Sequence, residues 1–343
     1  MTTAKRILVT GGAGYIGSHT CKALAAAGYV PVAFDDLCNG HAEAVQWGPL
    51  VRGDVRDAGA VADCIRLHDA RAVIHFAGLI EVGLSNRAPD LFWDYNLNGV
   101  AAVLAAMRQT GLERIVFSST AAVYGQPDLQ DVLAPLQESL PLQPINPYGD
   151  SKLAAERLIA ACAAAYGLKG VALRYFNASG ADAAGEIGEA HDPETHLIPL
   201  AIEAALGFGP ALTVFGADFP TPDGSCVRDY IHVSDLARAH VLALGLEMGE
   251  APFAAMNLGV GSGHSVLDVI RAVDRATGRK TPYRIGDRRS GDPASLVADP
   301  SLARERLGWR AAFTDLDEIV RVAVAWRLNP RFGPALAPAR QVA

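Results

Sequence analysis

Short apolar runs alternate with longer segments of helical periodicity through the first half of the chain. The apolar runs, several of which end at glycine or aspartate, predict strands at residues 5–10, 30–34, 49–52, 71–76, 113–118 and 170–175. The segments between them predict helices at residues 15–27, 58–68, 91–110 and 148–166. Strands that alternate with helices of this length are typical of a parallel, doubly wound α/β sheet.

The pattern changes after residue 176. Gly, Pro, Asp and His become dense between residues 178 and 199 and again between 216 and 228. Loops this long are usually functional or disordered, and apolar residues interrupt these two too often for disorder. We therefore predict an N-terminal domain over residues 1–176 and a smaller C-terminal α/β domain over residues 177–343, whose loops face a ligand. A strand and helix at 227–243 are expected to return to the first domain.

Composition narrows the classes of function. Half of the 343 residues are hydrophobic, which is enough for two domains with sizeable cores, and the net charge is −7. Because no long basic run occurs, we expect neither nucleic acid nor a membrane surface as a partner. No apolar stretch approaches the length of a membrane-spanning helix, and a strand begins within five residues of the N-terminus, so we expect no transmembrane segment and no signal peptide.

The cysteines and histidines argue for a reducing compartment and against a metal site. The five cysteines are odd in number, widely spaced and include no C-x-x-C pair, so we expect a cytoplasmic protein with neither disulfides nor a zinc site. Six histidines also show no metal-ligand spacing, namely His19, His75, His191, His196, His232 and His264.

A glycine motif follows the first predicted strand. Gly11, Gly14 and Gly17 form G-x-x-G-x-x-G at the start of a predicted helix. The first glycine permits a tight turn, the second lets the backbone approach a pyrophosphate, and the third lets the helix pack on the sheet. The unpaired N–H groups of the helix then face the phosphates. A glycine-rich turn without a ligand is the alternative, but the strand–turn–helix context favours a dinucleotide.

Acidic residues follow the second and third strands. Asp35 stands 18 residues after Gly17, where a carboxylate accepts hydrogen bonds from ribose hydroxyls and repels a 2′-phosphate. This favours NAD over NADP, and Asp36 adds to the effect. A solvated aspartate at the end of a strand is the alternative. Asp54 could meet the adenine amine, which is a weaker assignment.

Tyr148 and Lys152 stand four residues apart, so they share one face of a predicted helix. A lysine ammonium near a phenol lowers the phenol pKa, so Tyr148 can act as a general base, while Lys152 can also hold the nicotinamide ribose. An exposed Tyr–Lys pair is the alternative. The hydroxyl residues Ser118, Ser119 and Thr120 end a strand that should point at the same crevice, where they could contact a sugar.

These motifs resemble those of the UDP-glucose 4-epimerases, also called UDP-galactose 4-epimerases, of the extended short-chain dehydrogenase/reductase superfamily. The resemblance covers nearly the whole chain. The matching stretches are VTGGAGYIGSHT (9–20), FDDLCNG (34–40), GDVRD (53–57), VIHFAG (73–78), FSSTAAVYG (117–125), NPYGDSKLAAE (146–156), LRYFNASGA (173–181), DGSCVRDYIHVSDLA (223–237), NLGVGSGHSV (257–266) and RRSGDP (288–293). The last four are typical of nucleotide-sugar epimerases.

The resemblance implies a Rossmann-type NAD-binding domain, a UDP-sugar-binding domain and an isomerase of galactose metabolism. Such an enzyme interconverts UDP-glucose and UDP-galactose through a 4-keto intermediate, with transient hydride transfer to tightly bound NAD. Epimerases of UDP-xylose, UDP-arabinose or UDP-GlcNAc remain alternatives. A 4,6-dehydratase would need an Asp-Glu pair where Ala121 and Ala122 stand. An NAD-binding scaffold or sensor is the non-enzymatic alternative, against which the Tyr–Lys pair argues.

The resemblance also implies roles for individual residues. Tyr148 would be the catalytic base, Thr120 its partner at the sugar O4, and Lys152 the ligand of the nicotinamide ribose. The implied NAD-binding residues are Gly11, Gly14, Tyr15, Ile16, Gly17, Asp35, Asp36, Asn39, Asp54, Val55, Phe76, Ala77, Gly78, Asn96, Ser118, Tyr148, Lys152 and Tyr175. The implied UDP-sugar-binding residues are Thr120, Tyr148, Asn177, His196, Leu197, Phe215, Arg228, Arg289, Asp292 and Leu296. Relatives commonly pair through two long helices, here residues 91–110 and 153–166, so a homodimer is expected.

Four positions bear on how closely this chain follows the family. Thr120 stands where many relatives have serine, which keeps the hydroxyl. Ile80 replaces a lysine near the cofactor, and His196 replaces an asparagine found in some relatives. Leu296 lies where a tyrosine closes the sugar pocket against an N-acetyl group, so we expect a wider pocket here, although Leu296 could also merely pack against its loop.

Asp35 and Asp36 predict the identity of the bound dinucleotide. Because the two carboxylates repel a 2′-phosphate, denatured protein should release NAD rather than NADP. Chromatography of the released nucleotide measures this directly, and a preparation that releases mostly NADP would contradict the assignment.

Overall fold

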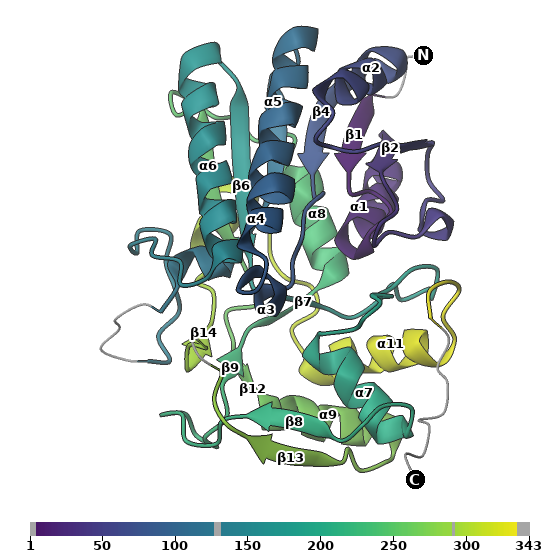
Figure 1. Ribbon diagram of the computed structural model, residues 1–343, viewed down its shortest axis with the longest axis vertical. Coiled ribbons are helices and arrows are strands. Elements are labelled where there is room, and N and C mark those ends of the chain that lie inside the picture. Colours follow the sequence, from purple (N-terminus) through teal and green to yellow (C-terminus); the bar gives the residue numbers. More distant parts are fainter. Residues whose placement is uncertain (1–4, 127–131, 290–291, 335–343) are drawn as a thin grey trace.

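The computed structural model describes residues 5–126, 132–289 and 292–334. Figure 1 shows a central sheet flanked by helices and, at one end of it, a smaller body built from later parts of the chain. The central sheet has seven strands in the order β11-β6-β5-β4-β1-β2-β3, and all of its neighbouring strands are parallel. The strands are β1 (Arg6–Thr10), β2 (Val30–Asp35), β3 (Leu50–Arg52), β4 (Ala70–His75), β5 (Arg114–Thr120), β6 (Lys169–Tyr175) and β11 (Phe253–Leu258).

Helices cover both faces of this sheet because successive strand residues alternate between two apolar cores. Leu8 faces α2, α5 and α6, whereas its neighbours Ile7 and Val9 face α1 and α8. The same alternation separates Val73 from Ile74. The helices are α1 (Tyr15–Ala26), α2 (Ala58–His68), α5 (Gly99–Thr110), α6 (Pro147–Tyr166) and α8 (Val233–Ala243). This architecture confirms the predicted doubly wound α/β class.

The long helix predicted at residues 91–110 is interrupted. The structure has α4 (Pro89–Phe92), a π-helical turn (Trp93–Asn98) and then α5. The π turn rotates the helix where Asn96 turns inward, and that side chain is 1% exposed. The sequence analysis missed the turn because apolar periodicity does not distinguish it from continuous α-helix. The four-residue helix α3 (Val82–Ser85) precedes this region.

The smaller body has its own apolar core and no part in the central sheet. Its helices are α7 (Leu197–Leu206), α9 (Val266–Thr277) and α11 (Leu316–Leu328), and they pack around a core that includes Val214, Tyr230 and Val269. Its strands pair as β8 (Leu212–Phe215) with β13 (Tyr283–Gly286), and as β12 (His264–Ser265), β9 (Val227–Arg228) and β14 (Ser295–Leu296) in a three-stranded sheet.

Segments from beyond residue 176 also join the central sheet and the helices that cover it. Helix α8 shares the core that contains β1 and α1, through Leu236, Ala239 and Ala243. Strand β11 pairs with β6 and supplies the seventh strand, which the sequence analysis did not predict. The two short strands β7 (Asn177–Ser179) and β10 (Tyr230–His232) pair with each other, and α10 (Ser301–Leu307) lies against β11 and α8.

This arrangement places two predicted site residues, Asp35 and Thr120, at the carboxyl ends of β2 and β5, at the edge where open α/β sheets bind ligands. Thr10 and His75 end the neighbouring strands β1 and β4. The smaller body lies beside this edge in Figure 1. Over the described parts of the chain, no helix combines the length and apolar character needed to cross a membrane.

Candidate active site

Close backbone contacts shape the glycine turn between β1 and α1. Gly11 has a φ of +71°, and a Cβ atom there would lie 2.7 Å from the backbone nitrogen of Ala77. A Cβ atom on Gly17 would lie 2.0 Å from the carbonyl oxygen of Gly11, so α1 packs directly on the loop. Gly14 is the N-cap of α1 and offers no side chain to the first turn. The N–H groups of that turn are therefore available to an anion such as a pyrophosphate.

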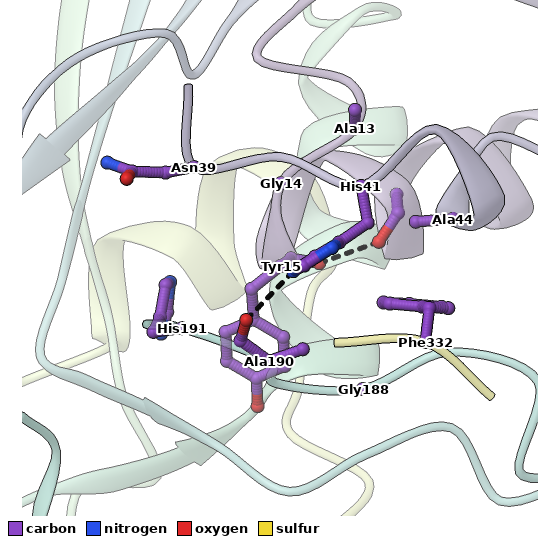
Figure 2. Close-up of a pocket in the computed structure, with 11 residues that line it drawn as sticks. Ala13, Gly14, Tyr15, Asn39, His41, Ala44, Gly188, Ala190, His191 and Phe332 are labelled. Carbon is purple, nitrogen blue, oxygen red and sulfur yellow. Dashed lines mark hydrogen bonds between the residues drawn. The ribbon is translucent and has the colours of Figure 1, made fainter. Parts of the chain in front are cut away.

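A narrow crevice adjoins this turn, as Figure 2 shows. Three predicted NAD-binding residues, Gly14, Tyr15 and Asn39, line it together. The hydroxyl of Tyr15 donates a hydrogen bond to the carbonyl oxygen of Gly180 at 2.6 Å, which fixes the ring across the start of α1. Ile16 instead packs against the core on the α1 and α8 face of the sheet.

The backbone of the neighbouring loops holds the carboxylate of Asp35 at the end of β2. Its Oδ2 atom accepts a hydrogen bond from the N–H of Ala13 at 2.9 Å, and its Oδ1 atom accepts one from Leu37 at 2.9 Å. Burial raises the pKa of Asp35, while these backbone donors act in the opposite direction. Asp36 accepts a hydrogen bond from the N–H of Cys38 at 2.9 Å. Each oxygen of Asp35 keeps a second lone pair, so the carboxylate can still accept from a ribose hydroxyl.

Asp54 has a cationic partner that the sequence analysis did not anticipate. Nη2 of Arg56 lies 2.6 Å from Oδ2 of Asp54, and the same guanidinium also pairs with Asp94. The hydrogen bonds from Arg56 lower the pKa of Asp54 and keep its carboxylate ionised. An adenine amine at this position would share the carboxylate with Arg56. The side chain of Val55 is buried in the core rather than directed at the crevice.

The loop after β4 takes its shape from Asn96. The Oδ1 atom of Asn96 accepts a hydrogen bond from the N–H of Leu79 at 2.8 Å, and Nδ2 donates to the carbonyl oxygen of Leu79 at 3.1 Å. A Cβ atom on Gly78 would lie 2.6 Å from that Oδ1 atom. Phe76 continues the pairing of β4 with β1, and Ala77 contacts the glycine turn through its backbone. The side chain of Asn96 is therefore used to orient the backbone of this loop, so any effect on a cofactor would pass through that backbone.

Lys152 is buried at the carboxyl end of β5. Its Nζ atom donates a hydrogen bond to the carbonyl oxygen of Ser118 at 3.1 Å and lies 5.1 Å from the centre of the Phe117 ring. The side chain is 3% exposed, and this burial lowers the pKa of Lys152 to about 8. The hydroxyl of Tyr175, at the end of β6, donates to the side chain of Ser118. Three of the predicted NAD-binding residues, Ser118, Lys152 and Tyr175, therefore lie together at the carboxyl ends of β5 and β6.

Tyr148 lies one helical turn before Lys152, at the start of α6. Asn146 caps this helix by accepting a hydrogen bond from the N–H of Gly149 at 2.8 Å. Burial raises the pKa of Tyr148, a side-chain hydrogen bond with Thr120 opposes that effect, and the charge of Glu81 adds to it. Thr120 and Tyr148 are therefore in contact, as the predicted roles require.

The predicted lowering of the Tyr148 pKa is not found. Its pKa is raised because the loss of water around the phenol dominates. Lys152 shares the helix face, as predicted, but its ammonium group is directed at the carbonyl oxygen of Ser118. Shared helix position alone therefore does not lower the phenol pKa.

A buried ion pair lies beneath these residues. Arg174 on β6 donates two hydrogen bonds to the carboxylate of Glu156 on α6, at 2.9 and 2.6 Å, and the two side chains are 5% and 3% exposed. Ser119 donates to the same carboxylate. Arg174 also donates to the hydroxyl of Tyr124 at 3.1 Å, which donates to Asn257 at 2.7 Å. This network joins α6, β5, β6 and β11 directly behind the catalytic candidates.

The residues predicted to bind the phosphates and the uridine form two pairs in the smaller body. Arg228 on β9 donates to the carbonyl oxygen of Pro293 at 3.0 Å, and its Nη2 atom lies 3.9 Å from Oδ1 of Asp292. The guanidinium of Arg289 lies 3.9 Å from the centre of the Phe215 ring, in a cation–π contact at the end of β8. Two guanidinium groups and one aromatic ring therefore stand near one another, which suits a nucleoside diphosphate.

Leu296 and Asn177 link this group to the sheet edge. Leu296 pairs with Arg228 across β14 and β9. It also packs against the apolar cluster that contains Ala121, the residue after Thr120. Asn177 follows the end of β6 by two residues and is held by a hydrogen bond from its N–H to the carbonyl oxygen of Asp229 at 3.0 Å. Leu296 therefore lies between Arg228, which is predicted to bind the diphosphate, and the segment that follows Thr120.

His196 is the N-cap residue of α7, and Leu197 begins that helix. Burial alone would lower the pKa of His196, but the carboxylates of Glu189 and Glu194 outweigh it and raise the pKa well above its usual value. These three residues gather with His191 so closely that their ligand-type atoms all lie within 4.8 Å of one another. The sequence analysis considered only the spacing of the histidines and so did not anticipate this grouping, which includes two glutamates.

The sequence analysis also missed several residues of the crevice. His41 donates a hydrogen bond from Nε2 to the carbonyl oxygen of Ala190 at 2.8 Å, and Phe332 packs beside its ring (Figure 2). The density of histidine and acidic residues between 178 and 199 was the available signal for this wall. Nothing in the sequence connected Phe332 with the glycine turn, because that contact depends on where α11 ends.

Comparison with known proteins agrees with this geometry. The model of the NAD dependent epimerase/dehydratase family matches residues 7–259. The chain belongs to this family. The family predicted from the sequence motifs is therefore confirmed.

Individual relatives are similar along nearly their whole length. A UDP-glucose 4-epimerase of Rhizobium meliloti (strain 1021) is 49% identical over 324 residues, which are 93% of this chain and 96% of that protein. The crystal structure of UDP-glucose 4-epimerase from Brucella ovis in complex with NAD has a TM-score of 0.90 and 49% identity, covering 94% of this chain and 98% of that one. The structure from Bifidobacterium longum, in complex with NAD+ and UDP, has a TM-score of 0.89 and 36% identity, covering 95% and 99%.

The buried lysine predicts an unusual dependence of stability on pH. The folded chain lowers the pKa of Lys152 to about 8, so below pH 8 the folded state bears the full cost of a buried ammonium. That cost, on the order of 3 kcal/mol, falls as the pH rises from 8 towards the unfolded value near 10.5. Lys152→Met should therefore be more stable than the wild type at pH 7, by less than this because Ser118 loses a donor, and the difference should shrink at higher pH.

Urea unfolding of nucleotide-free protein between pH 7 and pH 10 measures this difference. Lys169→Met, at the exposed start of β6, is the matched control and should show no such trend. A free-energy difference between Lys152→Met and wild type that stays constant across this range would contradict the assignment.

Proposed function

We propose that this chain is a UDP-glucose 4-epimerase that interconverts UDP-glucose and UDP-galactose with NAD as a bound cofactor. The observation that carries the proposal is the convergence of Tyr148, Thr120 and Lys152 at the carboxyl end of β5, beside the glycine turn. The relatives named above bear the same activity in their names and include structures with NAD and UDP. Residues 1–176 would carry most of the NAD site and residues 177–343 most of the UDP-sugar site.

The residues divide the reaction between proton transfer and positioning. Tyr148 takes the proton from the sugar O4, and the hydroxyl of Thr120 orients that oxygen through its bond with Tyr148. NAD+, when bound, supplies the acceptor for the C4 hydride and a positive charge in the crevice. Lys152 holds the nicotinamide ribose with an ammonium that the wall of β5 already fixes in place. The resulting 4-keto sugar turns over in the pocket and receives its hydride on the opposite face.

The environment of Tyr148 bears on its role as a base. Burial raises the pKa of Tyr148 and so favours the protonated phenol. A positive charge that arrives with the cofactor favours the phenolate by the same electrostatic rule that lets a cation lower the pKa of a neighbouring acid. Proton transfer is thereby coupled to an occupied site.

Firm hold on UDP and loose hold on the sugar are both required for turnover of the intermediate. Arg228 and Arg289 offer guanidinium groups to the diphosphate, Asp292 offers a carboxylate to the uridine ribose, and Phe215 lies near the uracil. The side of the pocket formed by Leu296 and the segment after Thr120 is apolar, so it contacts the sugar without fixing its hydroxyls. The buried Ala121 provides no acid or base for a dehydratase.

We also propose that the protein works as a twofold dimer in the cytoplasm. Helices α5 and α6 lie side by side in Figure 1 and contact each other. Their outward faces expose small residues, among them Ala101, Ala105 and Ala161, which permit close packing of helices from a second copy. All five cysteines are free thiols, which suits a reducing compartment.

The dimer proposal predicts a mass of twice 36.0 kDa by light scattering at micromolar concentration. A large charged side chain on the outward face of α6 should prevent close packing of the two copies, so Ala161→Arg should shift the mass towards that of the monomer. A wild-type protein with the mass of a monomer would refute the dimer.

Removal of the phenolic hydroxyl tests the catalytic base. Tyr148→Phe should keep NAD and UDP binding but lose roughly 10²–10⁴-fold in epimerisation, the usual contribution of general acid–base catalysis. Tyr166→Phe, at the exposed end of the same helix, is the control and should retain full activity. Near-normal turnover by Tyr148→Phe would rule out this role.

Leu296 predicts the breadth of sugars accepted. Leu296→Tyr should narrow the pocket and lower kcat/KM for UDP-GlcNAc relative to UDP-glucose by about tenfold or more, since one badly fitting group in a pocket costs this much. Leu296→Met conserves the volume and should leave the ratio alone. The products from UDP-glucose, UDP-GlcNAc and UDP-xylose, separated by chromatography, give the ratio; if tyrosine does not change it, Leu296 is not the gate.

A further inference from the structure

Four side chains gather in the loop between β7 and α7, at the wall of the crevice. We refer to Glu189, His191, Glu194 and His196 as the Glu–His cluster. One ligand-type atom from each residue lies within 4.8 Å of those of the other three. All four come from one stretch of eight residues with the pattern E-x-H-x-x-E-x-H. Neither the epimerase reaction nor the predicted NAD contacts use Glu189, His191 or Glu194.

The Glu–His cluster has fewer hydrogen-bond protons than close nitrogen–oxygen contacts. The Nδ1 atom of His196 lies 2.8 Å from Oε1 of Glu189 and 2.9 Å from Oε1 of Glu194. The Nδ1 atom of His191 lies 3.1 Å from the same Oε1 atom of Glu189. An imidazole nitrogen carries at most one hydrogen, so one proton on His196 is shared between two carboxylates. Two imidazole nitrogens and two carboxylate oxygens thus surround one small volume, and the nitrogens offer lone pairs to it once they carry no proton there.

The carboxylates are buried, which raises the cost of leaving their charge uncompensated. The side chains of Glu189 and Glu194 are 8% and 7% exposed. Two buried carboxylates carry two negative charges, which protons alone balance only if both imidazoles are charged. A divalent cation balances both carboxylates while the two imidazoles stay neutral.

The ligand-bearing loop is held in place independently of any ion. The Oε1 atom of Glu194 accepts hydrogen bonds from the N–H groups of Thr195 and His196, at 2.7 and 2.8 Å. The indole N–H of Trp326 donates to the carbonyl oxygen of Glu189 at 2.8 Å. The ring of His191 lies edge-on against Tyr15, with ring centres 6.2 Å apart. The donors are thus pre-positioned, as a metal site requires.

We propose that the Glu–His cluster binds one first-row divalent cation, with Zn²⁺ as the representative ion. Ligands at the roughly 2.0–2.2 Å typical of zinc stand about 3.3–3.6 Å apart in a tetrahedron. The observed contacts of 2.8, 2.9 and 3.1 Å would therefore widen by less than about 1 Å, and the longest separations, which reach at most 4.8 Å, would shorten. Two imidazoles and two carboxylates suit zinc or manganese better than magnesium or calcium.

The position of the cluster gives the ion a structural task. His196 caps α7 and precedes Leu197, which is predicted to contact the UDP-sugar. A cation on Nδ1 of His196 fixes the ring and leaves Nε2 directed away from the metal. The same ion ties this ring to His191, which packs against Tyr15 of the glycine turn. The cation therefore links the walls of the two predicted binding sites and takes no step in the reaction.

Metal titration of the untagged, NAD-containing protein tests the proposal. After dialysis against a chelator, Co²⁺ should bind at one equivalent per chain and give visible d–d absorption, which Zn²⁺ should then displace. X-ray absorption of the zinc-loaded protein should show nitrogen and oxygen ligands, with two imidazoles and no sulfur. A wild-type protein without a saturable site at micromolar Zn²⁺, or with sulfur bound to zinc, overturns the proposal and leaves the shared proton as the explanation of the geometry.

Two variants locate the ion. Glu194→Gln and His191→Ala should each weaken Zn²⁺ binding at least tenfold, since each removes a ligand. His68→Ala, in the last turn of α2, removes a histidine outside the cluster and should bind zinc as the wild type does. NAD content and circular dichroism confirm that each variant is folded. Unchanged zinc affinity in both folded cluster variants places the metal elsewhere and refutes the assignment.

Discussion

The buried ion pair between Glu156 and Arg174 is the contact on which the catalytic geometry depends. It joins the helix that carries Tyr148 and Lys152 to strand β6, and Ser119 joins β5 to the same carboxylate. Breaking such a pair by removing one partner leaves an unpaired charge in the interior, which commonly costs 3–5 kcal/mol. Because Glu156 follows Lys152 by one helical turn, the network also fixes the rotation of α6. The phenol and ammonium groups therefore reach the crevice from a helix that cannot turn about its axis.

Burial shifts the pKa values of the two catalytic candidates on this helix in opposite directions, raising that of Tyr148 and lowering that of Lys152. It favours the neutral form of both, so it keeps the proton on Tyr148 and makes the Lys152 ammonium easier to discharge. A charge that entered this crevice would therefore act on both groups at once, because little water is left to screen it.

The fold was largely accessible from the sequence because the two-sided burial of parallel strands leaves a strong pattern. Leu8 and its neighbours Ile7 and Val9 are all apolar, since both faces of β1 are covered. Strand β11 was not predicted because it joins the sheet edge from far downstream, where no local sequence pattern indicates that it pairs with β6. The π turn before α5 escaped because its side chains follow the apolar periodicity of an ordinary helix.

The candidate site was accessible only in part, for related reasons. Tyr148, Lys152 and the glycines belong to spaced motifs, so their meeting could be predicted. The direction of the Tyr148 pKa could not, because desolvation depends on residues such as Phe92 that pack around the ring. Arg56 beside Asp54 and the Glu–His cluster were missed because charge pairing within a loop depends on its path, which no periodicity encodes.

The positions of β11 and α8 late in the sequence have a consequence for folding during synthesis. Strand β11 covers the edge of β6, and α8 covers one face of the sheet against α1, yet both follow residue 230. A nascent chain that ends at residue 176 would expose the unpaired edge of β6 and an apolar face of β1 and β4. The seven-stranded sheet can therefore be complete only after residue 258 has left the ribosome, and separate expression of the N-terminal segment would favour aggregation.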